Sequence, residues 1–272
     1  MIDVLVSAYK QENFLSKCLD SILDQKINCN IILINPKPTG EYFKIIESYK
    51  DNIKTFIHEK DEGCADGLNK AIPHLLNNYS IVLNGDDYFL PQSLHTFVEY
   101  LKRDFDVLIG CTFLKDEIKS KIKIGRPYKF SPNKLIYGFS WIPHPSTIYN
   151  NRLFKLGHKF NIENKLFWDT ELLLDLYLDK KRFYYVNDFY SVYRIHEASI
   201  TSSIKNNSKI GEIKKLNYNI RDNYFYKIKG KKKIFIDNFL ISLTSFSFRV
   251  FRYFFEKITL NSKKIISDKY KN

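Results

Sequence analysis

The chain has 272 residues, of which 44% are hydrophobic and 27% are charged. This composition excludes an intrinsically disordered protein, and the length allows one full-sized domain with an appendage or two small domains. The net charge of +13 is uneven, because residues 205–272 hold 17 Lys or Arg against 5 Asp or Glu, a net of +12, which leaves residues 1–204 nearly neutral. The basic charge is therefore expected to serve a tail that meets an anionic surface rather than the main pocket.

The four cysteines indicate a reducing compartment. Cys18, Cys29, Cys64 and Cys111 form no C-x-x-C pair, and two of them lie in apolar runs, so buried free thiols are expected. The first residues lack the basic region of a signal peptide, and their apolar run is short and broken by Asp3. The sequence therefore predicts a cytoplasmic protein.

Short apolar runs alternate with helical spacing over the first 110 residues. Strands are expected at residues 4–6, 31–34, 55–58, 80–83 and 106–110. Helices are expected from a cap at Asn13 through Leu23, over residues 68–75, and from Pro91 through Leu101. This alternation predicts an α/β fold with a mostly parallel sheet covered by helices on both faces.

The pattern changes after Cys111. A charged hairpin is expected over residues 112–124, a loop and then a strand over 141–149, an amphipathic helix over 169–179, and short strands at 183–186 and 191–193. We therefore divide the chain into a catalytic domain over 1–204, with a donor half over about 1–110 and an acceptor half over 111–204, and a basic, aromatic helical extension over 205–272.

The extension combines a run of three lysines at 231–233 with an apolar, aromatic stretch at 234–255. Arg249 and Arg252 interrupt that stretch, which argues against a spanning helix. A helix that lies on an anionic inner leaflet and a helical pair that packs on the catalytic domain or on a second subunit both remain open. No recognised motif for nucleic acid accompanies the charge.

Two carboxylates directly follow the expected strand at 80–83. They are Asp86 and Asp87, in the run Asn84, Gly85, Asp86, Asp87. Open α/β sheets bind ligands at this place, beyond the carboxyl ends of their strands. Buried carboxylates are costly unless a cation meets them, and a hard divalent ion shared with substrate phosphates is the usual partner. The alternative is a solvated turn.

A second polar segment, residues 59–71, lies between a strand and a helix. Asp66 and Asn69 fall on one helical face, with Lys70 on the adjoining turn. Polar groups at a helix start beside a sheet edge suit a nucleotide or a sugar. Ordinary capping by Asp61 or Asp66 is the alternative reading.

These segments together resemble family 2 glycosyltransferases of the GT-A fold. The resemblance covers roughly residues 2–200, and the matching segments come in the same order as in the family. These segments are residues 4–10 with 19–25; 59–71; 84–87; 143–149 with Phe154, Gly157 and Phe160; 168–172; and 193–196 with Ser199. It implies an inverting transferase that moves a sugar from a nucleotide-diphosphate sugar, a UDP-sugar being favoured, to a hydroxyl of a glycan or undecaprenyl-linked glycan precursor. Bacterial capsule, lipopolysaccharide or other exopolysaccharide synthesis is the implied setting.

The resemblance also implies roles for individual residues. Asp169 is the general base, Asp86 contacts the donor ribose, and Asp87 binds Mn²⁺ or Mg²⁺. Arg194 and His196 reach the diphosphate or the metal. The remaining donor-side residues are Ala8, Tyr9, Asn35, Asp66, Asn69 and Lys70.

Two departures from the family pattern affect these roles. Asn35 stands after the second strand where the family usually has an Asp, which weakens the expectation of a uridine-reading side chain. Trp168 stands where the family usually has a Glu before the base. Its side chain is either an aromatic wall that stacks on a sugar or a core residue.

Two other functions compete with the transferase. A sugar nucleotidyltransferase would want a glycine-rich loop after the first strand, and residues 7–13 contain no glycine. A degenerate, non-catalytic relative that binds membrane or nucleic acid through its tail leaves Asp86, Asp87 and Asp169 without a role.

Overall fold

The computed structural model describes residues 1–127 and 142–199. The predicted extension at 205–272 and the last residues of the predicted catalytic domain lie outside these ranges. Within them, no helix combines the length and the apolar character that a membrane crossing requires.

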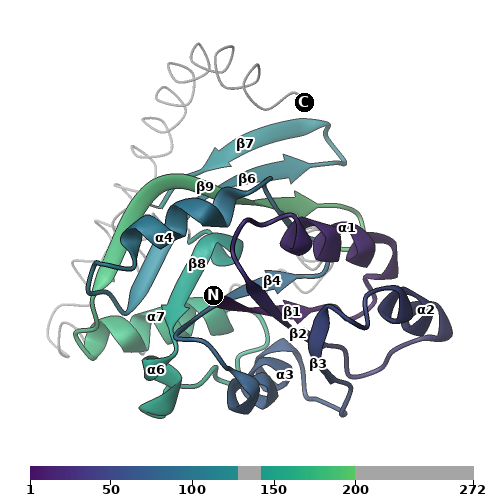
Figure 1. The fold of residues 1–272 in the computed structure, drawn as a ribbon, viewed down its shortest axis with the longest axis horizontal. Helices are drawn as coiled ribbons and strands as arrows, with labels where there is room; N and C mark the ends of the chain where they lie inside the picture. Colours follow the sequence, from purple (N-terminus) through teal and green to yellow (C-terminus); the bar gives the residue numbers. More distant parts are fainter. Residues whose placement is uncertain (128–141, 200–272) are drawn as a thin grey trace, which may run out of the picture.

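One twisted sheet runs through the described part of the chain in the order β3-β2-β1-β4-β8-β6-β9-β5, with β7 paired to β6 (Figure 1). The first four strands of this order are parallel, and β8 then joins β4 to β6 in antiparallel pairing. The strands are β1 (Ile2–Ser7), β2 (Cys29–Ile34), β3 (Ile53–Ile57), β4 (Tyr79–Asn84), β5 (Tyr88–Phe89), β6 (Val107–Asp116), β7 (Lys121–Gly125), β8 (Thr147–Asn150) and β9 (Phe183–Ile195).

Helices cover both faces of the sheet (Figure 1). They are α1 (Glu12–Leu23), α2 (Gly40–Ser48), α3 (Cys64–Ala71), α4 (Phe97–Tyr100), α6 (Arg152–Lys155) and α7 (Trp168–Leu178), with 3-10 turns η1 (Ile72–His74), η2 (Ser93–Thr96) and η3 (His144–Ser146). Successive strand residues point to opposite faces, so each central strand contributes to two cores. Val4 and Val6 belong to one core, whereas Leu5 belongs to the other.

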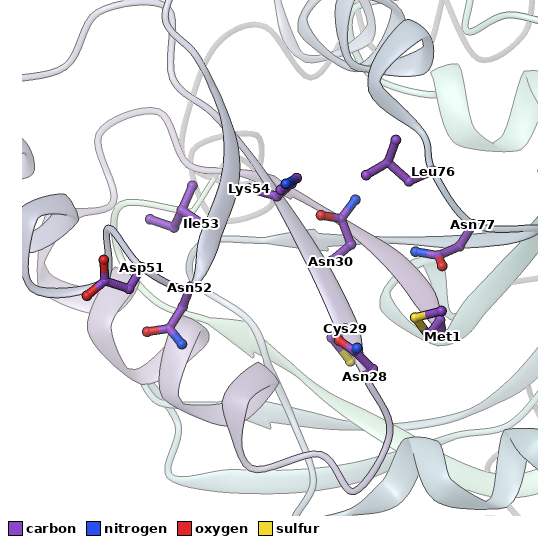
Figure 2. A pocket seen from close by; sticks show the side chains of 10 residues that line it. All are labelled: Met1, Asn28, Cys29, Asn30, Asp51, Asn52, Ile53, Lys54, Leu76 and Asn77. Carbon is purple, nitrogen blue, oxygen red and sulfur yellow. The ribbon is translucent and has the colours of Figure 1, made fainter.

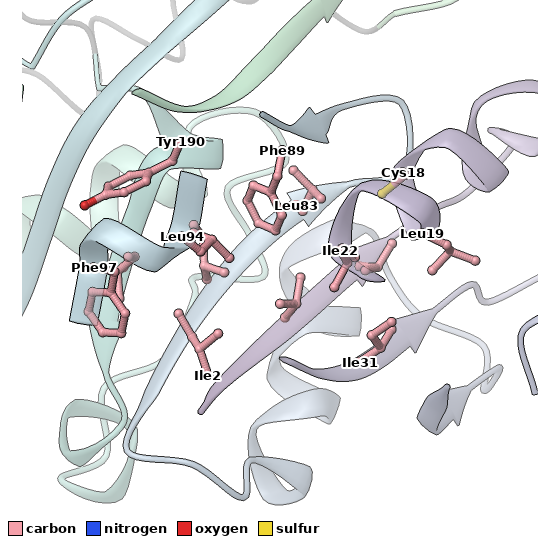
Figure 3. Close-up of a cluster of buried hydrophobic side chains, with 14 of the residues drawn as sticks. Ile2, Cys18, Leu19, Ile22, Ile31, Leu83, Phe89, Leu94, Phe97 and Tyr190 are labelled. Carbon is pink, nitrogen blue, oxygen red and sulfur yellow. The ribbon is translucent and has the colours of Figure 1, made fainter. Parts of the chain in front are cut away.

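The first core lies between the sheet and α1, α2, η2 and α4 (Figure 3). Leu15, Leu19 and Ile22 of α1 are fully buried there at helical spacing. The second core lies under α3, α6 and α7 and contains Leu68 and Leu172. Because both faces are buried, the central parts of the parallel strands are apolar on both faces, which explains the short apolar runs in the sequence.

The structure contains elements that the sequence did not predict, such as β5 and α6, and α1 begins at Glu12 with Gln11 at its N-cap instead of Asn13. A helix not expected from the sequence, α2, begins after Thr39, whose hydroxyl caps it by accepting a hydrogen bond from Tyr42 N at 3.2 Å. The two short strands expected at 183–186 and 191–193 are one strand, β9, with irregular pairing beside Gly110. The helix α7 buries Leu172, Leu173, Leu174 and Leu176, so apolar side chains occupy more of its circumference than an amphipathic helix would show.

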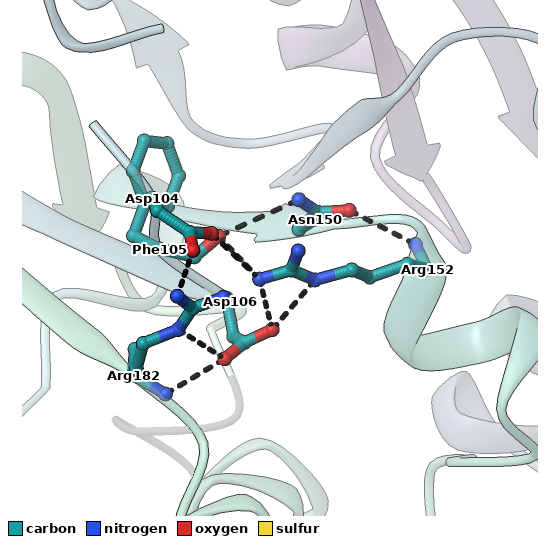
Figure 4. Close-up of polar contacts among 6 residues, drawn as sticks. All are labelled: Asp104, Phe105, Asp106, Asn150, Arg152 and Arg182. Carbon is teal, nitrogen blue, oxygen red and sulfur yellow. Dashed lines mark hydrogen bonds and ion pairs between the residues drawn. The ribbon is translucent and has the colours of Figure 1, made fainter. Parts of the chain in front are cut away.

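An ion-paired cluster fixes the amino ends of β6 and β9 (Figure 4). The buried Asp106 accepts from Arg152 Nε and from Arg182 N, each at 2.8 Å, and Asp104 pairs with both arginines. The cluster lies at the end of these strands away from Arg194 and His196, so its role is structural.

Asp3 anchors the amino end of the parallel sheet. Its carboxylate is fully buried and accepts from the backbone N–H groups of Leu76 and Asn77 and from the side-chain amides of Asn30, Asn77 and Asn151 at 2.7–3.1 Å. Hydrogen bonds to a charged acceptor are each worth about 1.5–3 kcal/mol, and losing the acceptor leaves its donors unpaired.

We predict that Asp3→Ala lowers the free energy of unfolding by about 3 kcal/mol or more, because several buried donors lose their acceptor at once. Urea unfolding followed by circular dichroism measures this loss. Asp51→Ala, at an exposed carboxylate near the same end of the sheet, is the control and should change the free energy by less than about 0.5 kcal/mol. Equal effects of the two substitutions would contradict this role.

Candidate functional site

The carboxyl ends of three parallel strands meet at one edge of the sheet. Ser7, the last residue of β1, stands in register with Ile34 of β2 and with Asn84 of β4. The loops that follow these strands therefore start side by side, as expected for a ligand site of an open α/β sheet.

The turn that follows β4 requires a glycine. Gly85 N donates to Ser7 O at 2.8 Å, and a Cβ at Gly85 would lie 2.6 Å from the Cβ of Ala8. A side chain at this position would push the two loops apart. Asp87 N then donates to Asn84 O at 2.9 Å, which closes the turn and sets the positions of both carboxylates.

Asp87 is buried, with 1% of its surface exposed. Its Oδ1 accepts from Arg194 N at 2.8 Å, and its Oδ2 faces Asn84 Nδ2 at 3.4 Å. Burial and the neighbouring charge of Asp86 raise the pKa of Asp87 well above the usual carboxyl value. Asp87 thus ties the end of β9 to the turn after β4.

Asp86 meets the imidazole of His196. The two side chains are about nine-tenths buried, and His196 Nε2 lies 3.0 Å from Asp86 Oδ2. The ring of Phe14 packs on His196 with the centroids 4.3 Å apart. The sequence grouped His196 with Asp87 as metal ligands and gave Asp86 the ribose. In the structure His196 instead contacts Asp86, because β9 ends beside the first carboxylate of the turn.

The guanidinium of Arg194 is occupied by a carboxylate. Its Nε and Nη2 donate to the two oxygens of Glu117 at 3.1 Å, and its plane lies over the ring of Phe14 at 4.3 Å. Lys115 also pairs with Glu117, at 3.2 Å. Arg194 therefore lies beside the Asp86–His196 pair, as the sequence suggested, but its charge is matched by a residue that the sequence did not single out.

Asp169 lies in the first turn of α7, with its side chain partly exposed. Its Oδ1 accepts from Thr170 N at 2.7 Å, and its Oδ2 lies 3.8 Å from Nδ1 of His144. Burial lowers the pKa of His144, while the charge of Asp169 acts in the opposite direction. A carboxylate with an exposed portion beside a neutral imidazole is suited to accept a proton.

Cys64 lies near both Asp86 and Asp169. Its thiol lies 3.3 Å from the hydroxyl of Ser7 at the sheet edge. Burial raises the pKa of Cys64 to about 12, and the charges of Asp169, Asp61 and Asp86 each add to this rise. The carboxylates of Asp86 and Asp169 therefore both lie near this thiol, which is partly buried beside Ser7.

The polar side chains of residues 59–71 make hydrogen bonds and an ion pair with other groups of the protein. Asp66 accepts from Glu62 N at 3.0 Å and pairs with Lys70 at 3.3 Å. Asn69 donates to Phe160 O at 2.8 Å and accepts from Phe160 N at 3.0 Å, so both ends of its amide are used. Asp66 thus makes local contacts at the start of α3 without capping it, because the helix has no side-chain cap, and Asn69 joins α3 to the loop after α6. No described contact directs either side chain to a ligand.

Of the site residues predicted after β1 and β2, some serve the fold and one is open to a ligand. Asn35 is fully buried, donates to Ala8 O at 3.1 Å and accepts from Lys37 N at 3.0 Å. Its amide thus holds two loops together. Ala8 is also buried, whereas Tyr9 is 47% exposed. Of these three, Tyr9 has the side chain that a ligand can reach directly.

Trp168 is a core residue. It is 8% exposed and meets the ring edges of Phe160 and His144 at centroid distances of 5.2 and 4.8 Å. The prediction of an exposed aromatic wall is therefore replaced by the alternative that the sequence left open.

A separate hollow of about 650 Å³ opens at the amino ends of the parallel strands (Figure 2). It is lined by Met1 and by residues 28–30, 51–54 and 76–77. These residues lie at the opposite end of β1, β2 and β3 from the acidic turn, and the hollow holds none of the candidate catalytic side chains.

The sequence model of glycosyl transferase family 2 matches residues 3–165, more than half of the chain. The chain therefore belongs to glycosyl transferase family 2, a family of transferase enzymes. It is 26% identical over 219 residues to glycosyltransferase GlyA of Streptococcus pneumoniae, a match that covers 74% of this chain. The chain spans 31% of the length of that relative.

Solved structures confirm the predicted GT-A fold class. The structure of S. aureus TarS (residues 1–349) in complex with UDP-GlcNAc matches with a TM-score of 0.62 and 18% identity, over 84% of this chain and 73% of that one. A mannosyltransferase of Pyrobaculum calidifontis in complex with GDP-Man and Mn²⁺ matches with a TM-score of 0.55 and 11% identity, over 91% and 80% of the two chains.

The residues at the acidic turn fit a divalent ion that is shared with a substrate. Asp86 and His196 supply a carboxylate and an imidazole side by side, and a cation would offset the cost of two adjacent carboxylates, one of them fully buried. Within residues 1–127 and 142–199, no three His, Cys, Asp or Glu side chains are grouped as a complete protein cage. An ion here would take further oxygens from a diphosphate and from water, as Mg²⁺ commonly does.

We predict that Asp87→Asn raises the melting temperature in EDTA. The pKa of Asp87 is higher in the folded chain, so folding favours the protonated form and stability falls as the pH rises from the usual carboxyl range through the raised value. At neutral pH the ionised group costs stability, and its neutral isostere should gain on the order of 1 kcal/mol, or about 2–4 °C.

Differential scanning fluorimetry at neutral pH measures this gain. Asp51→Asn, at an exposed carboxylate, is the control and should leave the melting temperature unchanged. A lower melting temperature for Asp87→Asn would show that the ionised carboxylate stabilises the fold.

Proposed function

We propose that the protein is an inverting, divalent-metal-dependent glycosyltransferase that moves a sugar from a nucleotide-diphosphate sugar to a hydroxyl group. The observation that carries the proposal is the meeting of two different carboxylate groups at one sheet edge. Asp86 with His196 forms one, and Asp169 with His144 forms the other. The first suits a cation and phosphates, and the second suits proton removal.

Asp86 and His196 would hold the metal, and Asp87 fixes the backbone that leads to His196. Asp87 occupies its two oxygens with Arg194 N and Asn84, so its support of this arrangement is structural. The metal, Mn²⁺ or Mg²⁺, supplies positive charge that offsets the charge developing on the diphosphate leaving group. The bound ligands of the two similar structures, UDP-GlcNAc and GDP-Man with Mn²⁺, support a donor of this class, with a UDP-sugar favoured.

Asp169 is the general base. It removes the proton of the acceptor hydroxyl while that oxygen forms a bond to the anomeric carbon. The bond between the anomeric carbon and the diphosphate oxygen breaks, and its electron pair leaves with the nucleoside diphosphate. A single base acting opposite the leaving group inverts the anomeric configuration. A correctly placed base contributes about 10²- to 10⁴-fold to the rate.

The acceptor is a hydroxyl of a glycan or of a lipid-linked glycan precursor, in the synthesis of a bacterial surface polysaccharide. This assignment follows the family resemblance. A cytoplasmic location with peripheral contact at an anionic membrane, made by the basic residues 205–272, would place the site beside a lipid-linked acceptor.

We predict that one of UDP, GDP, dTDP or CMP, added with Mn²⁺, raises the melting temperature by several degrees, because a ligand that binds only the folded state stabilises it by about 2.7 kcal/mol at a hundred times its Kd. Fluorimetry with each nucleotide, with and without Mn²⁺, measures the shift. Asp86→Ala and His196→Ala should abolish it.

Asp169→Asn is the matched control, since it alters the acceptor side. It should keep the nucleotide shift but reduce sugar transfer by about 10²-fold or more. Retention of the shift in Asp86→Ala and His196→Ala would overturn the metal assignment. No shift with any of the four nucleotides would favour a degenerate relative that binds no donor.

A further inference from the structure

His144 is a buried histidine without a hydrogen-bond partner in the described part of the chain. It is 8% exposed, and neither of its ring nitrogens has a partner among the described residues. A buried polar group left unpaired costs about 1–3 kcal/mol, so native structures keep few of them, and each asks for an explanation.

The position of His144 beside Asp169 explains its unpaired ring nitrogens. Its Nδ1 lies 3.8 Å from Oδ2 of Asp169, and no other ion pair to Asp169 occurs within residues 1–127 and 142–199. The other oxygen of Asp169 is held by Thr170 N in its own helix. One side of the carboxylate is thus fixed locally, and the imidazole is the donor that faces the second side.

The other side chains around Asp169 and His144 bring no charge to the pair. The rings of Trp168 and His144 pack nearly perpendicular to each other. The pKa of the buried Tyr149 phenol is raised by burial, with a further contribution from Asp169. Cys64 is a partly buried thiol whose pKa is also raised. All three surrounding side chains are therefore uncharged at neutral pH, and so is His144, because burial lowers its pKa.

The segment that carries His144 is rigid. Ser146 Oγ donates to Cys111 O at 2.7 Å and lies 2.6 Å from Ser191 Oγ, and Thr147 Oγ1 donates to Pro143 O at 2.9 Å. These buried contacts attach η3 to β6 and β9. A ring on such a support can fix the orientation of a neighbouring carboxylate, as supporting hydrogen bonds do in other catalytic sites.

We infer that His144 is a positioning residue whose Nδ1–H donates to Oδ2 of Asp169 and directs that carboxylate toward the acceptor hydroxyl. The inference rests on the proposed role of Asp169 as the base. A neutral donor orients the carboxylate without cancelling the negative charge that takes the proton. The hydrogen bond tightens from the present 3.8 Å by a small rotation of either side chain.

The first test needs no activity. Nuclear magnetic resonance of protein with ¹⁵N-labelled histidine, at neutral pH, reports which ring nitrogen of His144 carries the proton. We expect the Nδ1–H tautomer in the wild type and a changed Nδ1 resonance in Asp169→Asn. An Nε2–H tautomer, or a His144 signal that does not respond to Asp169→Asn, overturns the inference.

The second test is a series of substitutions assayed with Mn²⁺ and UDP-GlcNAc as the probe donor. Asn places an amide N–H near the position of Nδ1, Gln places one near Nε2, and Leu removes the donor. We expect His144→Gln and His144→Leu to lower kcat 10- to 100-fold at an unchanged KM for the donor, and His144→Asn to retain most of kcat. Melting temperatures and circular dichroism confirm that the variants fold. A common loss in all three, or none in His144→Leu, overturns the inference.

The series includes Asp169→Asn and the double variant with His144→Leu. If His144 acts through Asp169, the second change adds no further loss to Asp169→Asn. Wild-type transfer by Asp169→Asn would remove the proposed base and this inference with it. An inactive Asp169→Asn together with a fully active His144→Leu would remove the inference alone.

Discussion

The placement of two adjacent carboxylates at the end of one buried strand is the constraint on which the rest of the site depends. Asp87 is buried and its ionisation is disfavoured, so the fold must supply compensation. It does so with the backbone of Arg194 and, beside Asp86, with the ring of His196. These contacts attach the end of β9 to the end of β4. The site is therefore left with a carboxylate and an imidazole that a cation can bridge.

The sheet brings the second half of the site to the same edge. The register of β1, β2 and β4 aligns the loops that follow them, and Cys64 at the start of α3 lies beside Ser7 at the same edge, near both Asp86 and Asp169. The helix α7 is held by the second core, and its first turn presents Asp169. One rigid scaffold thus positions a group suited to a metal and a diphosphate opposite a group suited to proton transfer, which is what direct displacement at a sugar carbon requires.

The sequence predicted the parallel strands and the acidic turn, because unbroken apolar runs and polar residues after strands depend on short stretches of chain. The role of Asp169 came from the family resemblance and stays a prediction. It did not predict which side chains contact one another. Asn35 and Asn69 have the chemistry of ligand-binding residues, yet backbone groups 27 and 91 residues away use their amides. Glu117 pairs with Arg194 across 77 residues, and His144 faces Asp169 from another element. Such pairings depend on the folded sheet and have no signal in local spacing.

The association of a metal with Asp86 and His196 is the central claim, and paramagnetic broadening tests it most directly. Mn²⁺ with UDP is titrated into protein with ¹³C-labelled histidine, whose six residues give separate ring signals. We expect the His196 signal to broaden first and Asp86→Ala to prevent this broadening at the same Mn²⁺ concentration. A His196 signal that stays sharp while another histidine broadens would contradict the account and place the metal elsewhere.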